Sequence, residues 1–207
     1  YLYPFSILWL KPFVRMNRVV ITGTGIYSCI GKNLDEVRDS LYQGKSGIIF
    51  DPARKEFGYR SGLTGFVERP NLKSLLDRRS RLMLPEQGEY AYMSTLEALK
   101  NAKIDQDYID AHETGLIFGN DSSALSVIEA IDVIREKKNT AFAGSGAVFQ
   151  NLNSTVNMNL ATIFKLKGVN FTITASERVK PHGFTIRGAF NKAARVHEIK
   201  NAPDLMQ

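Results

Sequence analysis

The sequence predicts an α/β domain with a mainly parallel sheet. Short, almost wholly apolar stretches alternate with longer segments whose apolar residues recur every three or four positions. The first pattern is typical of strands buried on both faces, and the second is typical of helices that cover such a sheet. The 207 residues, with 43% hydrophobic and 23% charged side chains, suit one domain with a sizeable core.

The expected elements follow from these patterns and from the residues between them. Strands are expected at 18–22, 114–118 and 170–174, and helices at 34–43, 86–101, 125–137 and 154–167. Asn33 with Glu36 resembles a capping box before the first helix, and Gly44 is a suitable left-handed end. The last helix is expected to reach the cap Gly168, and residues 45–85 are expected to be irregular.

The carboxyl ends of the strands are where chemistry is expected, because ligands of open α/β sheets bind there. The turns concerned are Gly23–Gly25, Gly119–Ser123 and the residues after Thr174. The first turn lies in "GTGIYSCIG", where Ser28 takes the position of the third glycine of a dinucleotide-binding motif. A nucleotide site is therefore not expected at this turn.

Few side chains suit catalysis or metal binding. One cysteine, Cys29, and three scattered histidines predict neither an internal disulfide nor a metal site, and favour a reducing cytoplasm. No base lies beside Cys29 in the sequence, so we expect it to pack, with a nucleophilic role as the alternative. The segment 78–81, Arg-Arg-Ser-Arg, is expected to be a solvated basic loop, with a site for an anionic carrier or a phosphate as the alternative.

The charge of +6 and the apolar N-terminus do not predict a nucleic-acid or membrane partner. Most of the excess basic residues lie before Met16 and after Ala175 rather than on the expected domain. The apolar run Phe5–Leu10 is far shorter than the roughly 20 residues of a membrane span. Because "MNRVVITGTGI" opens at Met16 like a true start, residues 1–15 are interpreted as a non-native upstream extension.

Four blocks in order carry a resemblance to a known family. They are "MNRVVITGTGIYSCIGKNLDEVRDSLYQGKSGI" (16–48), "LLDRRSRLM" (75–83), "TGLIFGNDSSA" (114–124) and "NSTVNMNLATIFKLKGVNFTITA" (153–175). They resemble the β-ketoacyl-acyl-carrier-protein synthases, and most closely the elongating condensing enzymes of bacterial type II fatty-acid synthesis. The resemblance covers residues 16–175, which we expect to be the N-terminal half of the synthase domain.

The resemblance implies a thiolase-like fold, of which this chain would supply the first half only, as a helix-flanked, mixed and mainly parallel sheet that is incomplete. It implies an acyltransferase that condenses an acyl thioester with malonyl-acyl-carrier protein, without a metal or organic cofactor. The implied partners are acyl-carrier protein and a second subunit of a homodimer. Gly119, Asn120 and Asp121 are implied to border the acyl pocket, and Leu152 to reach the partner subunit's pocket.

The chain departs from the family directly after the last expected strand. The family has its nucleophilic Cys there, at a helix start that suits a thiolate, whereas this sequence has Glu177 in "ASERVKP". No catalytic residue is therefore assigned, and both family histidines belong to the second half. Two explanations stay open for residues 176–207: a genuine substitution, and an aberrant tail that is frameshifted or disordered.

The expectation is thus a truncated β-ketoacyl-acyl-carrier-protein synthase, inactive as this chain. The alternative is a non-enzymatic half-domain that pairs with a separate second half or with an intact synthase. Such a half-domain would expose apolar faces and strand edges.

Overall fold

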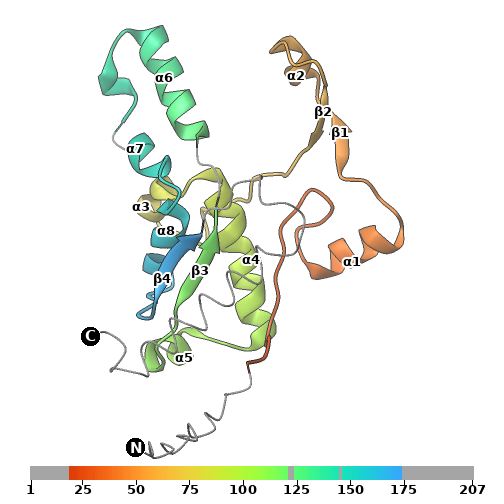
Figure 1. Cartoon of the computed structure of the whole chain (residues 1–207), viewed down its shortest axis with the longest axis vertical. Helices are drawn as coiled ribbons and strands as arrows, with labels where there is room; N and C mark the ends of the chain where they lie inside the picture. Colours follow the sequence, from red (N-terminus) through yellow and green to blue (C-terminus); the bar gives the residue numbers. More distant parts are fainter. Residues whose placement is uncertain (1–18, 121–123, 145, 174–207) are drawn as a thin grey trace, which may run out of the picture.

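The computed structural model describes residues 19–120, 124–144 and 146–173. Its central strands are β3 (Leu116–Gly119) and β4 (Asn170–Ile173), which pair in parallel from Leu116↔Asn170 to Gly119↔Ile173. Figure 1 shows the two strands side by side, with helices around them. The expected parallel pairing of these two segments is therefore confirmed.

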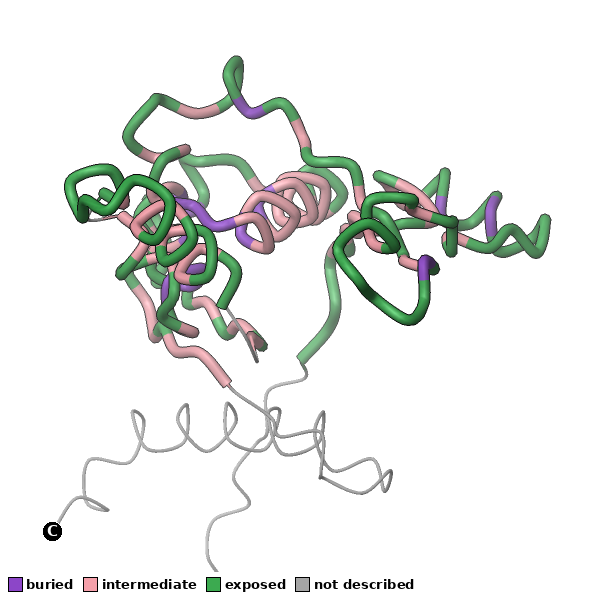
Figure 2. The backbone as a smooth tube through the Cα atoms, turned by 90° about the horizontal axis from the view of Figure 1, so that it is seen from above, coloured by how far each residue is buried: buried purple, intermediate pink, exposed green. Residues whose placement is uncertain are grey.

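The core lies where two helices meet these strands. Helix α4 (Glu86–Ala102) packs on α8 (Thr155–Ile163), and α8 contacts both β3 and β4. The buried apolar cluster consists of Leu72, Leu84, Tyr92, Val156, Leu160 and Phe164. The rings of Tyr92 and Phe164 stack with their centroids 5.5 Å apart. Figure 2 shows buried residues in this region, on and around the helices.

A second sheet stands apart from the first. Strands β1 (Ile48–Phe50) and β2 (Leu63–Gly65) pair antiparallel and form an arm that extends from the core (Figure 1). Between them lies α2 (Pro52–Glu56), which begins where the Asp51 carboxylate accepts a hydrogen bond from the Ala53 amide. Parallel and antiparallel pairings thus occupy separate two-stranded sheets. The segment 45–85, expected to be irregular, contains these two strands and two helices, α2 and α3 (Arg78–Met83).

The other helices connect these parts. They are α1 (Leu34–Tyr42), α3 (Arg78–Met83), α5 (Gln106–Ala111), α6 (Leu125–Lys137) and α7 (Gly146–Gln150), with a 3-10 turn η1 (Thr140–Phe142). The expected ends of α1 are confirmed, because the Asn33 side chain caps the Glu36 amide and Gly44 has φ +63°.

The expected strand at 18–22 does not form over 19–22, the part of it that the structure describes. Directly after these residues, Gly23, Gly25 and Ile26 lie close against α4. A Cβ on Gly25 would lie 2.0 Å from the Ser94 carbonyl oxygen, and the Ile26 amide donates to the Glu97 carboxylate at 2.8 Å. Close backbone contact with a helix therefore explains these glycines, rather than a turn after a paired strand.

The expected helix over 154–167 ends four residues earlier than predicted. Helix α8 stops at Ile163, and Lys165 adopts a left-handed φ of +54°. The buried Phe164 packs against the core at this point, and the Gly168 amide donates to the Thr114 carbonyl at 2.9 Å. Tertiary packing at the entry to β4 thus overrides a sequence that favours helix.

Candidate functional site

The parallel pairing of β3 and β4 brings two chain segments together at one edge of the sheet. Gly119 pairs with Ile173, and the Asn120 amide donates to the Ile173 carbonyl at 3.1 Å. A Cβ on Gly119 would meet no atom of the described residues within 4 Å. This edge is the position at which α/β sheets bind ligands.

The start of α8 lies against the same edge. The Asn120 side-chain amide donates to the Asn153 carbonyl at 2.9 Å, across 33 residues of sequence. Leu152 precedes this contact and is 47% exposed. The structure therefore brings Gly119 and Asn120 together with the segment that contains Leu152, whereas Asp121 and Glu177 lie outside the described residues.

Helix α8 is held rigidly beside this edge. Thr155 and Val156 are fully buried, and the Asn159 side chain donates to the Met83 carbonyl at 2.9 Å. The Oγ1 atom of Thr155 and the Oδ1 atom of Asn157 are buried and have no hydrogen-bond partner in the part of the chain that the structure describes. Such atoms cost stability when they leave water, so the helix start contains two unfavourable polar groups within a tight apolar environment.

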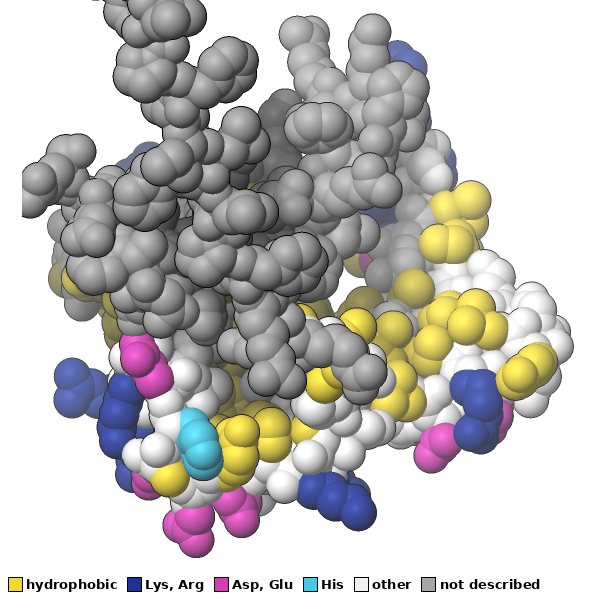
Figure 3. Space-filling view, turned by 60° about the horizontal axis from the view of Figure 1, so that its bottom comes forward, with side chains coloured by type: hydrophobic (Ala, Val, Ile, Leu, Met, Phe, Trp, Pro, Cys, Tyr) yellow, Lys and Arg dark blue, Asp and Glu magenta, His cyan; other side chains and the backbone are white. Residues whose placement is uncertain are grey.

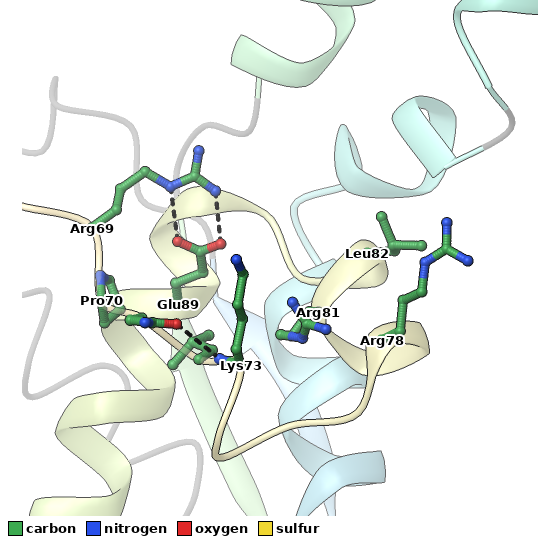
Figure 4. Close-up of a pocket in the computed structure, with 9 residues that line it drawn as sticks. Arg69, Pro70, Lys73, Arg78, Arg81, Leu82 and Glu89 are labelled. Atoms are coloured by element: carbon green, nitrogen blue, oxygen red, sulfur yellow. Dashed lines mark hydrogen bonds and ion pairs between the residues drawn. The ribbon is translucent and has the colours of Figure 1, made fainter.

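A second feature is an open cavity of about 410 Å³ between the loop at 69–73, α3 and the start of α4. Arg69, Lys73, Arg78 and Arg81 line it together with a single acidic residue, Glu89. Figure 4 shows that Arg69 and Glu89 face each other on one side of the cavity and that Arg78 lies on the other. The cavity is therefore a predominantly basic site of a size that accepts an anionic group.

The segment 78–81 is helical rather than a loop. The Asp77 carboxylate accepts hydrogen bonds from the Ser80 amide at 3.0 Å and from the Ser80 hydroxyl at 2.7 Å. These bonds lower the pKa of Asp77 and start α3, which presents Arg78 and Arg81 to the cavity. The sequence had no signal that Arg69, Lys73 and Glu89 belong to this site, because it is assembled by folding.

No histidine lines the cavity at Cys29 among the residues that the structure describes. The Cys29 side chain is exposed and lines this open cavity of about 500 Å³ with polar neighbours such as Lys32, Glu36 and Ser40. A Cβ on Gly47 would come within 2.6 Å of the Cys29 sulfur, so the thiol packs closely against backbone. The side chain is thus more exposed than expected of a packing residue, while its close approach to Gly47 agrees with a packing role.

The described ranges contain neither a metal-binding cluster nor a membrane-spanning helix. No group of three or more His, Cys, Asp or Glu side chains in 19–120, 124–144 and 146–173 is arranged to hold a metal ion. Within the same ranges, no helix has the length and apolarity needed to cross a membrane.

Comparison with known proteins shows the family. Residues 16–177 match the model of the β-ketoacyl synthase N-terminal domain. The chain is 35% identical to 3-oxoacyl-[acyl-carrier-protein] synthase 1 of Haemophilus influenzae and 34% identical to that of Escherichia coli K12. Each alignment covers 81% of this chain and 41% of the relative, so the chain spans about two fifths of the length of these curated relatives.

Solved structures show the same fold. A β-ketoacyl synthase from Burkholderia phymatum superposes with a TM-score of 0.70 over 87% of this chain and 44% of its own, at 21% identity. A type II polyketide ketosynthase solved in complex with its acyl-carrier protein superposes with a TM-score of 0.58 over 75% of this chain and 37% of its own, at 19% identity. The fold is thus thiolase-like, and the chain belongs to the β-ketoacyl synthase family, whose N-terminal domain residues 16–177 match.

Proposed function

We propose that this chain is the N-terminal part of a 3-oxoacyl-acyl-carrier-protein synthase of fatty-acid synthesis, and that it binds acyl-carrier protein but does not catalyse condensation. The observation that carries the proposal is the family match over 16–177, which ends on a glutamate where the family's nucleophilic cysteine is expected. A carboxylate at that position cannot form the thioester through which the family transfers acyl groups. We propose the cytoplasm as its compartment.

The edge formed by β3, β4 and the start of α8 is the proposed acyl-binding region. Gly119, Asn120 and Asp121 would border the acyl chain, and Leu152 would reach into a partner subunit. The hydrogen bond from Asn120 to Asn153 supports this assignment, because it joins the turn after β3 to the segment beside Leu152. The space that the described residues leave at Gly119 supports it as well, since an acyl chain needs room beside the backbone.

The basic cavity is the proposed docking surface for the carrier protein. Lys73, Arg78 and Arg81 would face acidic side chains of the carrier, since charge complementarity guides such encounters. Among the described residues, Lys73 and Arg78 make no ion pair within the chain. Their charges are thus open to a partner.

The test uses a radiolabelled acyl-carrier protein and the full chain. We expect no label to remain on the chain after denaturation, while fluorescence anisotropy detects salt-sensitive binding of the carrier. A Cys29→Ser variant serves as the control for accidental acylation of the exposed thiol. Label that survives in this variant would overturn the proposed lack of acyl transfer, and carrier binding that Lys73→Glu leaves unchanged would overturn the docking surface.

Exposed apolar surface supports a second candidate, a half-domain that pairs with another chain. On α6 the exposed apolar residues Leu125, Ile128 and Ile131 recur every three positions, and α7, which contacts α6, exposes Val148 and Phe149. Figure 3, in which the bottom of the Figure 1 view is turned forward, shows further apolar side chains (yellow) exposed at several places on the surface. Contiguous apolar surface of this kind marks protein interfaces. A homodimer or a complex with an intact synthase, detected by co-purification and size-exclusion chromatography, would support this candidate, whereas a stable monomer that binds neither would exclude it.

A further inference from the structure

The basic cavity contains an internal ion pair between its loop and α4. Arg69 donates from Nε to one oxygen of Glu89 at 2.9 Å and from a terminal nitrogen to the other oxygen at 2.7 Å. Figure 4 draws both bonds, with the guanidinium and the carboxylate face to face. This two-bond geometry is the strongest arrangement that an arginine and a carboxylate adopt.

The two partners are buried to very different degrees. The Glu89 side chain is 12% exposed, whereas the Arg69 side chain is 59% exposed. Glu89 is therefore fixed in the wall of the cavity, and Arg69 lies over it from the solvent side. Arg69 can therefore bind an anion of another molecule only if that anion displaces the Glu89 carboxylate from the guanidinium.

The cavity thus has four basic side chains but only three uncompensated charges. Arg69 is neutralised by Glu89, while Lys73, Arg78 and Arg81 have no acidic partner among the described residues that line the cavity. A second acid, Glu86, lies one turn earlier on α4, where it accepts the Tyr90 hydroxyl at 2.6 Å rather than bonding Arg69.

We infer that Glu89 is a selectivity determinant of the cavity, because it withholds Arg69 from weakly anionic partners and releases it only to a partner with several clustered negative charges. The inference rests on the proposed docking of an acidic carrier protein and adds the group that sets how acidic the partner must be. The physical cause is competition for Arg69. A single carboxylate on a partner would form an ion pair with Arg69 no stronger than the pair that Glu89 already forms, and water and salt would weaken it further.

Removal of the Glu89 charge tests the inference in the full chain. We expect Glu89→Gln to tighten binding of acyl-carrier protein about three- to tenfold at low salt, because Arg69 then becomes a fourth open cation. The gain should vanish near 1 M salt, where the screening length is about 3 Å. The double variant Arg69→Gln/Glu89→Gln should return to within about twofold of the original affinity.

A matched control separates release of Arg69 from a general change in charge. Glu86→Gln removes one negative charge from the first turn of α4, where Glu89 also lies, and leaves the Arg69–Glu89 bonds in place. We expect it to change the affinity for acyl-carrier protein by less than about twofold. An equal gain in Glu86→Gln, or a gain that persists in the double variant, would overturn the inference. If Glu89→Gln fails to fold, Arg69→Gln replaces it in the test. This variant should bind acyl-carrier protein more weakly than the original chain, because the Glu89 carboxylate is then unpaired and repels an acidic partner.

A second probe keeps this inference distinct from the proposed function. Inorganic tripolyphosphate presents clustered charges without a protein surface, and isothermal titration should show tighter binding to Glu89→Gln than to the original chain. If the carrier binds neither protein while tripolyphosphate still distinguishes them, the carrier proposal fails and the role of Glu89 stands. If neither probe distinguishes them, the role of Glu89 is wrong.

Discussion

The side chain of Asn120, at the end of β3, donates a hydrogen bond of 2.9 Å to the backbone carbonyl of Asn153, just before α8. The bond is partly buried and joins segments 33 residues apart. It joins the end of β3 to the start of α8 at the proposed acyl-binding edge.

Asn120→Ala should lower the free energy of unfolding by about 1 kcal/mol, the usual net value of such a bond. Urea denaturation followed by circular dichroism measures the change. Asn101→Ala, at an exposed position near the end of α4, is the control and should show no loss. Equal stability of the two variants would mean that the Asn120 bond contributes nothing to the edge.

Thr155→Val should stabilise the chain by about 1 kcal/mol. The Thr155 hydroxyl is fully buried and has no hydrogen-bond partner among the described residues, so its removal recovers a desolvation cost while the volume stays nearly constant. Thr162→Val is the matched control on the same helix, because that exposed hydroxyl bonds the Met158 carbonyl. A destabilised Thr155→Val protein would show that the hydroxyl has a favourable contact.

Stability should fall at alkaline pH because of Tyr90. Burial and the hydrogen bond to Glu86 raise the pKa of the Tyr90 phenol in the folded chain. The protonated form is favoured by folding, so this stability is fully present below the unfolded pKa of about 10 and is lost as the pH rises above it. Urea unfolding between pH 8 and 11 should show a steeper loss in the original chain than in Tyr90→Phe, and parallel curves would contradict the prediction.

The origin of residues 176–207 is a prediction from the sequence alone. A back-translation of Ser176–Pro181 that is read one base later yields Ala-Ser-Gly-x-Ser, close to what the family has after its cysteine. We therefore propose a frameshift or recombination near codon 175. Sequencing the gene from codon 165 in independent isolates tests it. The same in-frame tail in all of them, with no second-half gene nearby, would favour a genuine substitution instead.

Local signals in the sequence were reliable where they act within one turn. Asn33 with Glu36 and the left-handed Gly44 determine the ends of α1, because caps depend only on neighbouring backbone groups. Where distant contacts compete, the prediction was wrong. The strand predicted at 18–22 does not form over its described residues, and the chain directly after it packs against α4 through Gly23 and Gly25. The end of α8 is set by the packing of Phe164.

The sequence by itself determined the family and the α/β class, because these depend on the order of residues along the chain. Only the tertiary structure showed the basic cavity and the long-range contacts within both candidate sites. Arg69 and Glu89 are 20 residues apart, and Asn120 and Asn153 are 33 apart. No local propensity links such pairs, since they meet only when α4, α8 and the β3–β4 sheet bury their shared apolar core.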